Sequence, residues 1–309
     1  MKLISILTAC YNEEANIAEV YRQVKAQFAN LPQYHYEHIF IDNASTDRTV
    51  PILKEIAQKD HNVKIIVNAR NFGHVRSPFY GLLQAKGDAV MSLVADLQDP
   101  PELIPDFLRK WEAGAKVVIG VKKTSEESRW MFALRQLFYK IIGSISEVNM
   151  IANFTGFGLY DKKIMEVLKT IDDPYPYFRG LISEIGYDIE RVEYVQPLRQ
   201  GGKTKNNFYT LYDMAMLGIT SHSRVPLRLA TMLGFGVAAL SAIFAIGYLA
   251  YKLIFWNSFQ VGIAPLVIGL FFFSAVQLFF IGIIGEYVGS IYTQVLKRPL
   301  VIEKERINF

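Results

Sequence analysis

The stretch Leu3-Ile-Ser-Ile-Leu-Thr-Ala-Cys-Tyr-Asn-Glu-Glu14 joins a short apolar run to a polar turn. An apolar run of this length that ends in a turn is typical of a buried β-strand. The residues after it have apolar side chains at helical spacing, namely Ile17, Val20, Tyr21, Val24 and Phe28. The stretch therefore predicts a strand, a polar turn and a helix at the start of an α/β domain.

The same alternation continues to about residue 121. Further strand-like runs cover 38–41, 63–67, 89–95 and 117–121, and helical patterns cover 47–58, 76–86 and 101–113. Strands that alternate with helices form a mostly parallel sheet with right-handed crossovers. Ligands of such sheets bind at the carboxyl ends of the strands. The residues just after each strand are therefore the candidates for function.

Polar residues follow each of the first four predicted strands. These segments are 8–14 (TACYNEE), 42–47 (DNASTD), 68–74 (NARNFGH) and 96–102 (DLQDPPE). The first of them has no glycine, whereas a dinucleotide-binding turn would carry G-x-G-x-x-G, which argues against NAD or FAD.

The fourth segment carries several oxygen ligands within four residues. Asp96, Gln98 and Asp99 offer carboxylate and amide oxygens, which Mg²⁺ and Mn²⁺ prefer, with substrate phosphates completing the shell. The alternative is an ordinary helix start, in which Asp99 caps the helix and Pro100 and Pro101 open it.

Composition limits the class of protein. The net charge of +4 over 309 residues is too small to indicate nucleic-acid binding. The basic excess lies from Arg199 onward, where ten Lys and Arg stand against four Asp and Glu. A single cysteine, Cys10, excludes a disulfide framework and suits a reducing compartment.

Two long stretches in the C-terminal third, 229–251 and 253–285, carry no charged side chain. About 20 helical residues cross the ~30 Å hydrocarbon core of a bilayer, so each stretch predicts a membrane-spanning helix, and the pair predicts a hairpin. The flanking basic residues are Arg224, Arg228, Lys297, Arg298, Lys304 and Arg306. By the positive-inside rule, both ends of the hairpin are cytoplasmic.

Apolar residues at helical spacing also precede the first span, from Phe208 to Ile219. They predict an amphipathic helix on the membrane surface, with a core-facing helix as the alternative. Gly285 and Gly289 have the small-xxx-small spacing of helix contacts, so a homo-oligomer is a further prediction.

Four segments of the chain resemble, in the same order, the motifs of glycosyltransferase family 2. They are Tyr-Asn-Glu-Glu (11–14), Asp-x-x-Ser-x-Asp (42–47), Arg-Asn-Phe-Gly (70–73) and Asp-Leu-Gln-Asp-Pro (96–100). Within that family the sequence is similar to the polyprenyl-phosphate glycosyltransferases, which include bactoprenol glucosyltransferases and dolichol-phosphate mannose synthases. Residues 199–205 (RQGGKTK), the two spans and 285–289 (GEYVG) extend the resemblance over nearly the whole chain.

The resemblance implies a GT-A fold, which is a Rossmann-like α/β domain with a mostly parallel sheet. It implies inverting transfer of a sugar, expected to be glucose, from a UDP-sugar to a polyprenyl (undecaprenyl) phosphate, with Mg²⁺ or Mn²⁺ as cofactor. A bacterial inner membrane is the natural setting. The predicted boundaries are 1–206 for the cytosolic GT-A domain, 207–225 for the juxtamembrane helix region, 226–290 for two transmembrane helices and 291–309 for a cytosolic tail.

Position by position, the resemblance also implies roles for individual residues. The nucleotide would contact Thr8, Tyr11, Glu13, Asp42, Arg70 and Asp96. The metal would be bound by Asp96 and Gln98. Catalysis and phosphate binding would involve Asp96, Asp161, Arg129, Arg135, Arg199 and Lys205.

Three positions depart from the family pattern. Val94 stands where the family usually has the first Asp of a D-x-D pair, and the segment 155–158 (TGFG) lacks a proposed catalytic Asp, which leaves Asp161 as the nearest candidate. Asn43 and Ala44 replace a frequent Asp-Gly. These departures leave an alternative open, namely a non-catalytic, membrane-anchored sensor or scaffold that binds a sugar nucleotide.

Overall fold

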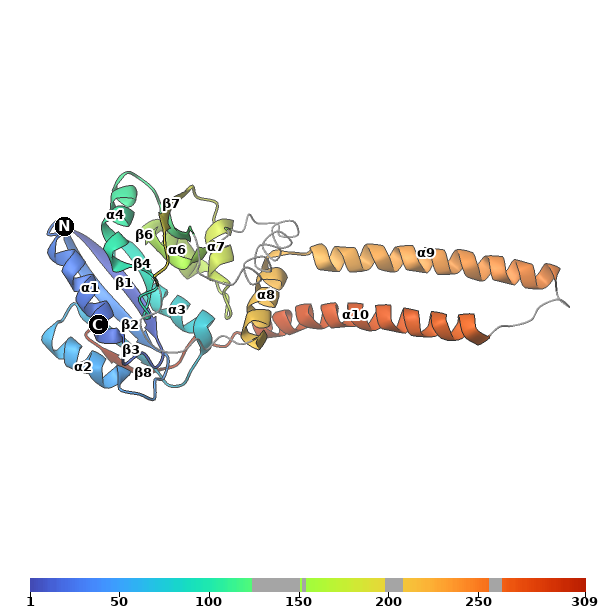
Figure 1. Ribbon diagram of the computed structural model, residues 1–309, viewed down its shortest axis with the longest axis horizontal. Helices are drawn as coiled ribbons and strands as arrows, with labels where there is room; N and C mark the ends of the chain where they lie inside the picture. Colours follow the sequence, from blue (N-terminus) through green and yellow to red (C-terminus); the bar gives the residue numbers. More distant parts are fainter. Residues whose placement is uncertain (124–150, 152–153, 198–207, 256–262) are drawn as a thin grey trace.

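The computed structural model describes residues 1–123, 151, 154–197, 208–255 and 263–309. It has two parts, an α/β domain and a long helical hairpin that projects from one end of it (Figure 1). Both chain termini lie on the α/β domain, away from the hairpin.

The described residues form one sheet of eight strands in the order β7-β5-β6-β4-β1-β2-β3-β8. Its parallel centre consists of β1 (Lys2–Cys10), β2 (Tyr34–Asp42), β3 (Val63–Asn68) and β4 (Ala89–Val94). On one side β6 (Phe154–Asp161) runs antiparallel to both β4 and β5 (Val117–Lys122), and β7 (Ile189–Tyr194) is parallel to β5. The predicted mostly parallel sheet is confirmed.

Helices cover both faces of this sheet. The first face carries α1 (Ile17–Ala29), α2 (Thr49–Lys59) and α4 (Ile104–Glu112), the last of which follows a short 3₁₀ turn, η1 (Pro101–Leu103). The second face carries α3 (Gly73–Gln84), α6 (Lys162–Thr170) and α7 (Phe178–Glu184).

Strand alternation produces these two layers, because successive side chains of a strand point to opposite faces. On β2, Ile39 and Ile41 pack with α3, whereas Phe40 packs with α1 and α2. The apolar runs that predicted buried strands therefore supply both halves of the core.

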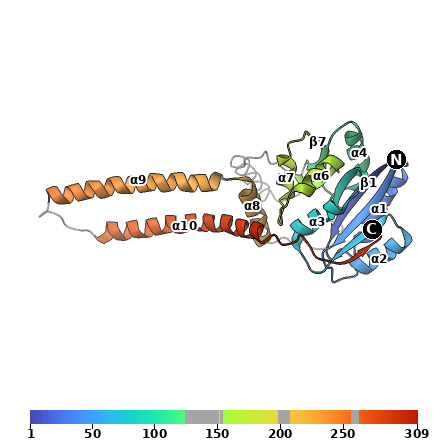
Figure 2. The same cartoon turned by 180° about the vertical axis from the view of Figure 1, so that it is seen from behind.

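Three further helices form the hairpin and its base. They are α8 (Phe208–His222), α9 (Val225–Ile254) and α10 (Ile263–Leu296). α8 lies between the α/β domain and the hairpin, and the view from behind shows the same arrangement (Figure 2).

Both long helices are apolar enough to cross a bilayer. The candidate spans are Val225–Ile254 and Ile268–Leu296, and none of the apolar window of either is buried in the protein. At ~1.5 Å per residue, α9 is about 45 Å long, which exceeds the ~30 Å hydrocarbon core. Such large exposed apolar surfaces are typical of contact with lipid.

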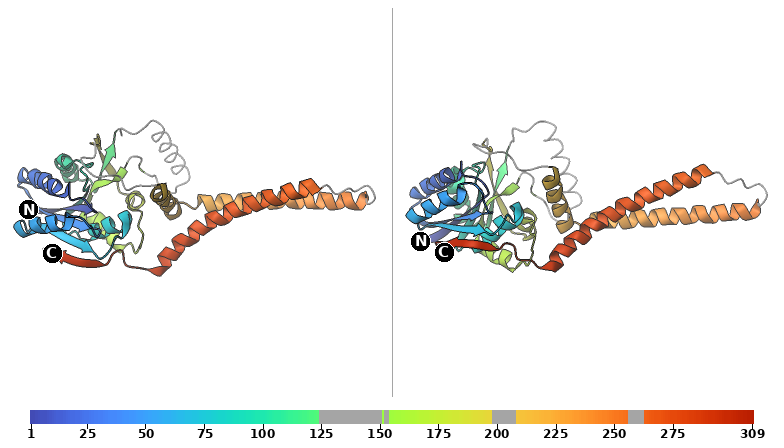
Figure 3. Two further views of the ribbon diagram at one scale, coloured as in Figure 1. Left: turned by 60° about the horizontal axis from the view of Figure 1, so that its bottom comes forward. Right: turned by 90° about the horizontal axis from the view of Figure 1, so that it is seen from below.

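The C-terminal segment returns to the α/β domain. β8 (Glu303–Ile307) pairs antiparallel with β3 and forms an edge of the sheet, along the domain and away from the hairpin (Figure 3). The sequence predicted only a cytosolic tail from 291. In the structure 291–296 continue α10, and the tail ends as a strand of the sheet.

Candidate active site

Four polar segments meet at one edge of the sheet. Strand register brings Cys10 beside Asp42, Asp42 beside Val67, and Ala9 beside Val94. The turns that follow β1, β2, β3 and β4 therefore lie together, as the parallel sheet predicts.

The turns after β1 and β2 are joined by hydrogen bonds. Asn12 N donates to Ser45 Oγ at 2.8 Å, and Thr46 N donates to Asn12 Oδ1 at 2.8 Å. Glu13 N donates to Thr49 Oγ1 at 2.9 Å. These contacts hold Tyr11 and Glu13, both half-buried, in a fixed position beside the second turn.

Left-handed backbone recurs in these turns. Asn12 (φ 54°), Ala44 (φ 63°) and Leu97 (φ 60°) follow β1, β2 and β4 respectively. Asparagine tolerates this conformation, whereas a residue such as Ala or Leu is disfavoured by roughly 1–2 kcal/mol. Backbone strain of this kind tends to cluster at functional sites. Glycine adopts the left-handed conformation without strain, which explains why the family often has Gly where this chain has Ala44.

Asp42 and Thr8 lie at this edge but are fully buried. Asp42 Oδ2 accepts from Ser45 N at 2.9 Å, and burial raises the pKa of its carboxyl. Thr8 Oγ1 lies 2.9 Å from His38 Nε2. Direct contact of either side chain with a nucleotide would require the turn to open. In this structure both side chains are packed beneath the turns and hold them in place.

His38 makes the stability of the domain depend on pH. Burial lowers the pKa of its imidazole to about 3, against about 6.5 in an unfolded chain. The unfolded state therefore binds more protons as pH falls below 6.5, and stability is lost. From pH 7 to pH 5 we expect a loss of about 2 kcal/mol from this group. Thermal melting of His38→Gln, which cannot titrate there, should show a pH dependence smaller by that amount. Equal pH dependence in both proteins would contradict this assignment.

Asn43 organises the turn after β3. Its Nδ2 donates to Asn71 Oδ1 at 2.9 Å and to Gly73 O at 3.1 Å. Its Oδ1 accepts from Phe72 N at 2.8 Å and from Asn68 Nδ2 at 3.2 Å. The sequence marked Asn43 only as a departure from the family pattern, and its four contacts became visible in the structure.

This network explains the amide at position 43. In Asn43→Asp the carboxylate would face two acceptor oxygens and lose both donated hydrogen bonds. We expect a loss of about 2–4 kcal/mol in stability, because buried groups are left unpaired. Thermal melting measures this loss, and Asn43→Ser, which retains one donor, should lose less. A variant Asn43→Asp as stable as the parent would show that the network is unimportant.

The exposed rim of the site carries Arg70. Its Nη1 donates to Asn71 O at 3.1 Å, and its guanidinium lies 4.1 Å from the centre of the Phe72 ring. The predicted residues Tyr11, Glu13, Arg70, Asp96 and Gln98 thus all follow strands that end at this edge.

The metal prediction rests on Asp96 and Gln98. Both are half-buried, and Gln98 N donates to Asp96 Oδ1 at 3.2 Å. Within the described ranges no group of three His, Cys, Asp or Glu side chains could hold a metal. Val94 is 42% exposed where a second carboxylate would stand. One carboxylate and one amide fit a cation that arrives with substrate phosphates, since Mg²⁺ often binds through one carboxylate and phosphate oxygens.

Asp161 does not fit a role in catalysis. β6 runs antiparallel to β4, so Asp161 pairs with Ala89 at the edge opposite the polar turns. There it caps α6 by accepting from Lys163 N, and it also accepts from Trp111 Nε1 at 2.7 Å and Lys116 Nζ at 3.0 Å. The predicted phosphate-binding residues Arg129, Arg135, Arg199 and Lys205 lie outside the described residues.

A cavity of about 420 Å³ adjoins the polar edge. Its walls come from β4, β6, α3, α7 and α8, and most of its lining is apolar, including Pro78, Val94 and Met214. The acidic and basic side chains in its lining are Asp99, His74 and Arg179. The cavity therefore extends from the carboxyl end of β4 toward α8, at the base of the hairpin.

Asp99 is the buried acid of this cavity. It is 4% exposed, and its Oδ1 accepts from Tyr194 OH at 3.0 Å. Burial raises its pKa to about 6. Asp99 therefore faces the cavity as a hydrogen-bonded carboxyl rather than as the helix cap that the sequence offered as an alternative.

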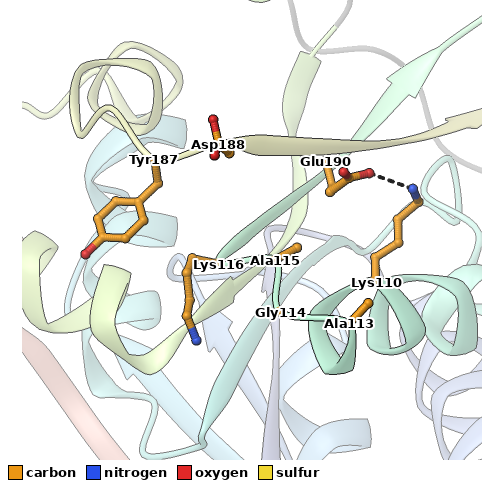
Figure 4. A pocket seen from close by; sticks show the side chains of 8 residues that line it. All are labelled: Lys110, Ala113, Gly114, Ala115, Lys116, Tyr187, Asp188 and Glu190. Carbon is orange, nitrogen blue, oxygen red and sulfur yellow. Dashed lines mark hydrogen bonds and ion pairs between the residues drawn. The ribbon is translucent and has the colours of Figure 1, made fainter.

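Another pocket, of about 430 Å³, lies at the opposite edge of the sheet (Figure 4). Its charged residues are mostly paired, as Lys110 with Glu190 at 2.8 Å and Lys116 with Asp161 at 3.0 Å. It adjoins the first residues of β5 and β7, away from the carboxyl ends where sheets of this class bind ligands. We therefore place the active site at the cavity beside β4.

Comparison with known proteins shows the family of this chain. Residues 5–169 match the glycosyl transferase family 2 model. YkcC of Bacillus subtilis (strain 168), an uncharacterized glycosyltransferase, is 35% identical over 96% of this chain and 92% of its own length. The SfII prophage-derived bactoprenol glucosyl transferase of Shigella flexneri is 35% identical over 98% of this chain and 97% of its own length.

A solved structure matches the fold. Glucosyl-3-phosphoglycerate synthase from Mycobacterium tuberculosis, in complex with Mn²⁺, UDP and phosphoglyceric acid, has a TM-score of 0.51 at 17% identity, over 71% of this chain and 76% of that one. The α/β domain thus has the GT-A fold with a mostly parallel sheet. By its family match and its near full-length relatives, the chain belongs to glycosyl transferase family 2.

Proposed function

We propose that this glycosyltransferase transfers a sugar, expected to be glucose, from a UDP-sugar to a polyprenyl phosphate at the cytosolic face of the membrane. The observation that carries the proposal is the cavity beside β4, which joins the polar strand ends to the base of an apolar hairpin. A water-soluble donor and a lipid acceptor need such a junction. Several relatives are named bactoprenol glucosyl transferase, which supports a polyprenyl phosphate as the acceptor and glucose as the sugar.

The donor nucleotide belongs at the turns after β1, β2 and β3. Tyr11, Glu13 and Arg70 offer the groups nearest the rim, while Thr8 and Asp42 support them. Asp96 and Gln98 would hold Mg²⁺ or Mn²⁺ together with the diphosphate. When bound, the cation neutralises charge on the departing UDP.

The transfer itself needs no base from the protein. A phosphate monoester has a second pKa of about 6 and is mostly dianionic at pH 7. An acceptor oxygen forms the bond to the anomeric carbon while the bond from that carbon to the UDP oxygen breaks, and its electron pair leaves with UDP. The loss of Asp161 as a candidate base is therefore consistent with this chemistry.

The protein contributes positioning instead. Well-aligned reactants can gain ~7–11 kcal/mol, more than the ~3–5 kcal/mol that a 10²–10⁴-fold base effect supplies. Basic residues must also screen one phosphate from the other. Arg129, Arg135, Arg199 and Lys205 remain our proposal for part of that task.

The hairpin would hold the site at the membrane surface. The start of α9 and the end of α10 both adjoin the α/β domain (Figure 2), and Arg224, Arg228, Lys297 and Arg298 lie at that end. The positive-inside rule then puts the α/β domain in the cytoplasm. A bacterial inner membrane, and a homo-oligomer formed through the hairpin, remain further proposals.

A panel of labelled nucleotide sugars tests the function. Detergent-purified protein is incubated with a short polyprenyl phosphate and each donor, in Mg²⁺, Mn²⁺ or EDTA. We expect one donor, UDP-glucose, to give a labelled, butanol-extractable lipid, and EDTA to abolish it. UDP binding without any lipid product would instead favour the sensor or scaffold, for which the exposed Val94 is the structural argument.

A further inference from the structure

Arg179 is a half-buried cation whose hydrogen-bond contacts in the structure are long. It lies in α7 and lines the cavity beside β4. Its Nη1 lies 3.5 Å from Phe154 O, and its Nη2 lies 3.9 Å from Met214 Sδ. Within the described ranges no carboxylate lies within ion-pair distance of it. A guanidinium has five N–H donors, so most of its hydrogen-bonding capacity is available to a ligand.

The charge of Arg179 reaches into the cavity. His74 lines the same cavity, and its pKa is lowered by burial and then by the charge of Arg179. The guanidinium also lies 5.3 Å from the centre of the Tyr177 ring, which forms part of the wall. An unpaired cation in a largely apolar cavity is unfavourable by itself and is stabilised by an anion.

The backbone around Arg179 is held from both sides. Gly180 packs so closely on His222, at the end of α8, that an added Cβ would lie 2.1 Å from His222 Nε2. Phe178 packs edge-on against Phe79 and Tyr160. These contacts fix α7 between the sheet and the base of the hairpin, and so they fix the direction of Arg179.

The cavity thus carries an acid and a cation on different elements. Asp99 follows β4, near the predicted metal ligands, whereas Arg179 lies on α7 beside Met214 of α8. Beside the carboxyl of Asp99, at the β4 end, an anion is disfavoured unless a cation accompanies it, as proposed for the donor diphosphate. An anion with an apolar body would therefore bind with its charge at Arg179 and its body against Pro78, Val94 and Met214.

We propose that Arg179 binds the phosphate of the prenyl acceptor and orients it toward the anomeric carbon of the donor. This inference rests on the proposed function and adds a contact on the membrane-facing wall of the cavity. The donor diphosphate, by contrast, is assigned to Asp96, Gln98 and their cation. Arg179 would therefore serve the acceptor and not the nucleotide.

Steady-state kinetics and direct binding test this assignment. In Arg179→Gln we expect kcat/KM for polyprenyl phosphate to fall by about 10- to 100-fold, as for loss of a hydrogen-bonded charge. The Kd for UDP should stay within about twofold. Arg179→Lys should recover part of the loss, since it keeps the charge and loses the planar fork. Arg191→Gln, at an exposed position of β7, is the matched control and should behave as the parent.

Farnesyl phosphate serves as a probe that needs no turnover. Its affinity, measured by calorimetry, should fall in Arg179→Gln by a similar factor, with the melting temperature unchanged. If the parent makes lipid-linked sugar and the variant keeps its acceptor kinetics, the Arg179 assignment is wrong and the proposed function stands. An equal loss of UDP affinity would move Arg179 to the donor site. A parent without any lipid product would overturn both proposals.

Discussion

Replacing Asp96 with asparagine should lower sugar transfer at least about 10²-fold while leaving the fold intact. The expected size follows from removing one preorganised electrostatic contact to a developing charge. The turn after β4 has two carboxylates near the site. Asp96 is half-buried and accessible, whereas Asp99 is buried and hydrogen-bonded to Tyr194. Initial rates at saturating metal and donor measure the effect.

Two companion variants make this test specific. Asp106→Asn removes an exposed carboxylate on α4, which pairs with Arg109 at 3.0 Å, and should leave the rate unchanged. Val94→Asp adds the second carboxylate at a 42% exposed position. It should lower the concentration of Mn²⁺ that gives half-maximal activity. Full activity of Asp96→Asn would exclude Asp96 from metal and diphosphate binding.

Deleting residues 301–309 should destabilise the α/β domain by more than about 3 kcal/mol and abolish activity. The deletion removes β8 and its hydrogen bonds to β3. It also removes the buried Val301 and the two hydrogen bonds, each 2.9 Å long, from Asn308 Nδ2 to Ala57 O and Val63 O. Each lost partner of a buried polar group costs about 1–3 kcal/mol.

Thermal melting in detergent measures this loss, and at ~2–4 °C per kcal/mol a fall of about 10 °C is expected for a domain of this size. Glu305→Gln is the matched control, because it removes only a half-exposed ion pair with Lys54 at 2.6 Å. Exposed pairs of this kind contribute up to about 1 kcal/mol. An unchanged melting temperature after the deletion would show that β8 is dispensable.

β8 also bears on function, because it attaches the second end of the hairpin to the sheet. The chain enters the hairpin through α8 and leaves it through α10, and Arg76 donates to Pro299 O where the chain passes α3. The α/β domain is thereby joined to the hairpin at two points. Its position relative to the membrane depends on both.

The central strands and helices could be predicted because their patterns are local. Apolar runs of four to seven residues predicted β1 to β5, and the largest difference is that β2 begins four residues before the predicted 38–41. β8 could not be predicted, since Glu303-Lys-Glu-Arg-Ile307 has a single apolar residue. Its stability comes from pairing with β3, more than 200 residues earlier in the chain, which no local pattern reveals.

Part of the candidate site could also be predicted from the sequence. Asp96 and Gln98 are close together directly after a predicted strand, and this spacing indicated them as candidate metal ligands. Asp161 was chosen as the nearest carboxylate in sequence, and the antiparallel direction of β6 moves it to the opposite edge.

Arg179 and Asn43 act through contacts that only the fold assembles. The partners of Arg179 lie on β6 and α8, and Asn43 meets residues of the next turn, around Asn71. Neither set of partners is close in sequence, so no motif indicated them.

The proposed reaction is tested by the mass of the lipid formed from undecaprenyl phosphate and UDP-glucose, with detergent-purified protein and Mg²⁺. We expect undecaprenyl phosphate plus one hexose, with one UDP released per lipid formed and at least about 10²-fold less product in Asp96→Asn. Release of UDP with free glucose as the product, or no change in the mass of the lipid with any sugar nucleotide, would contradict it.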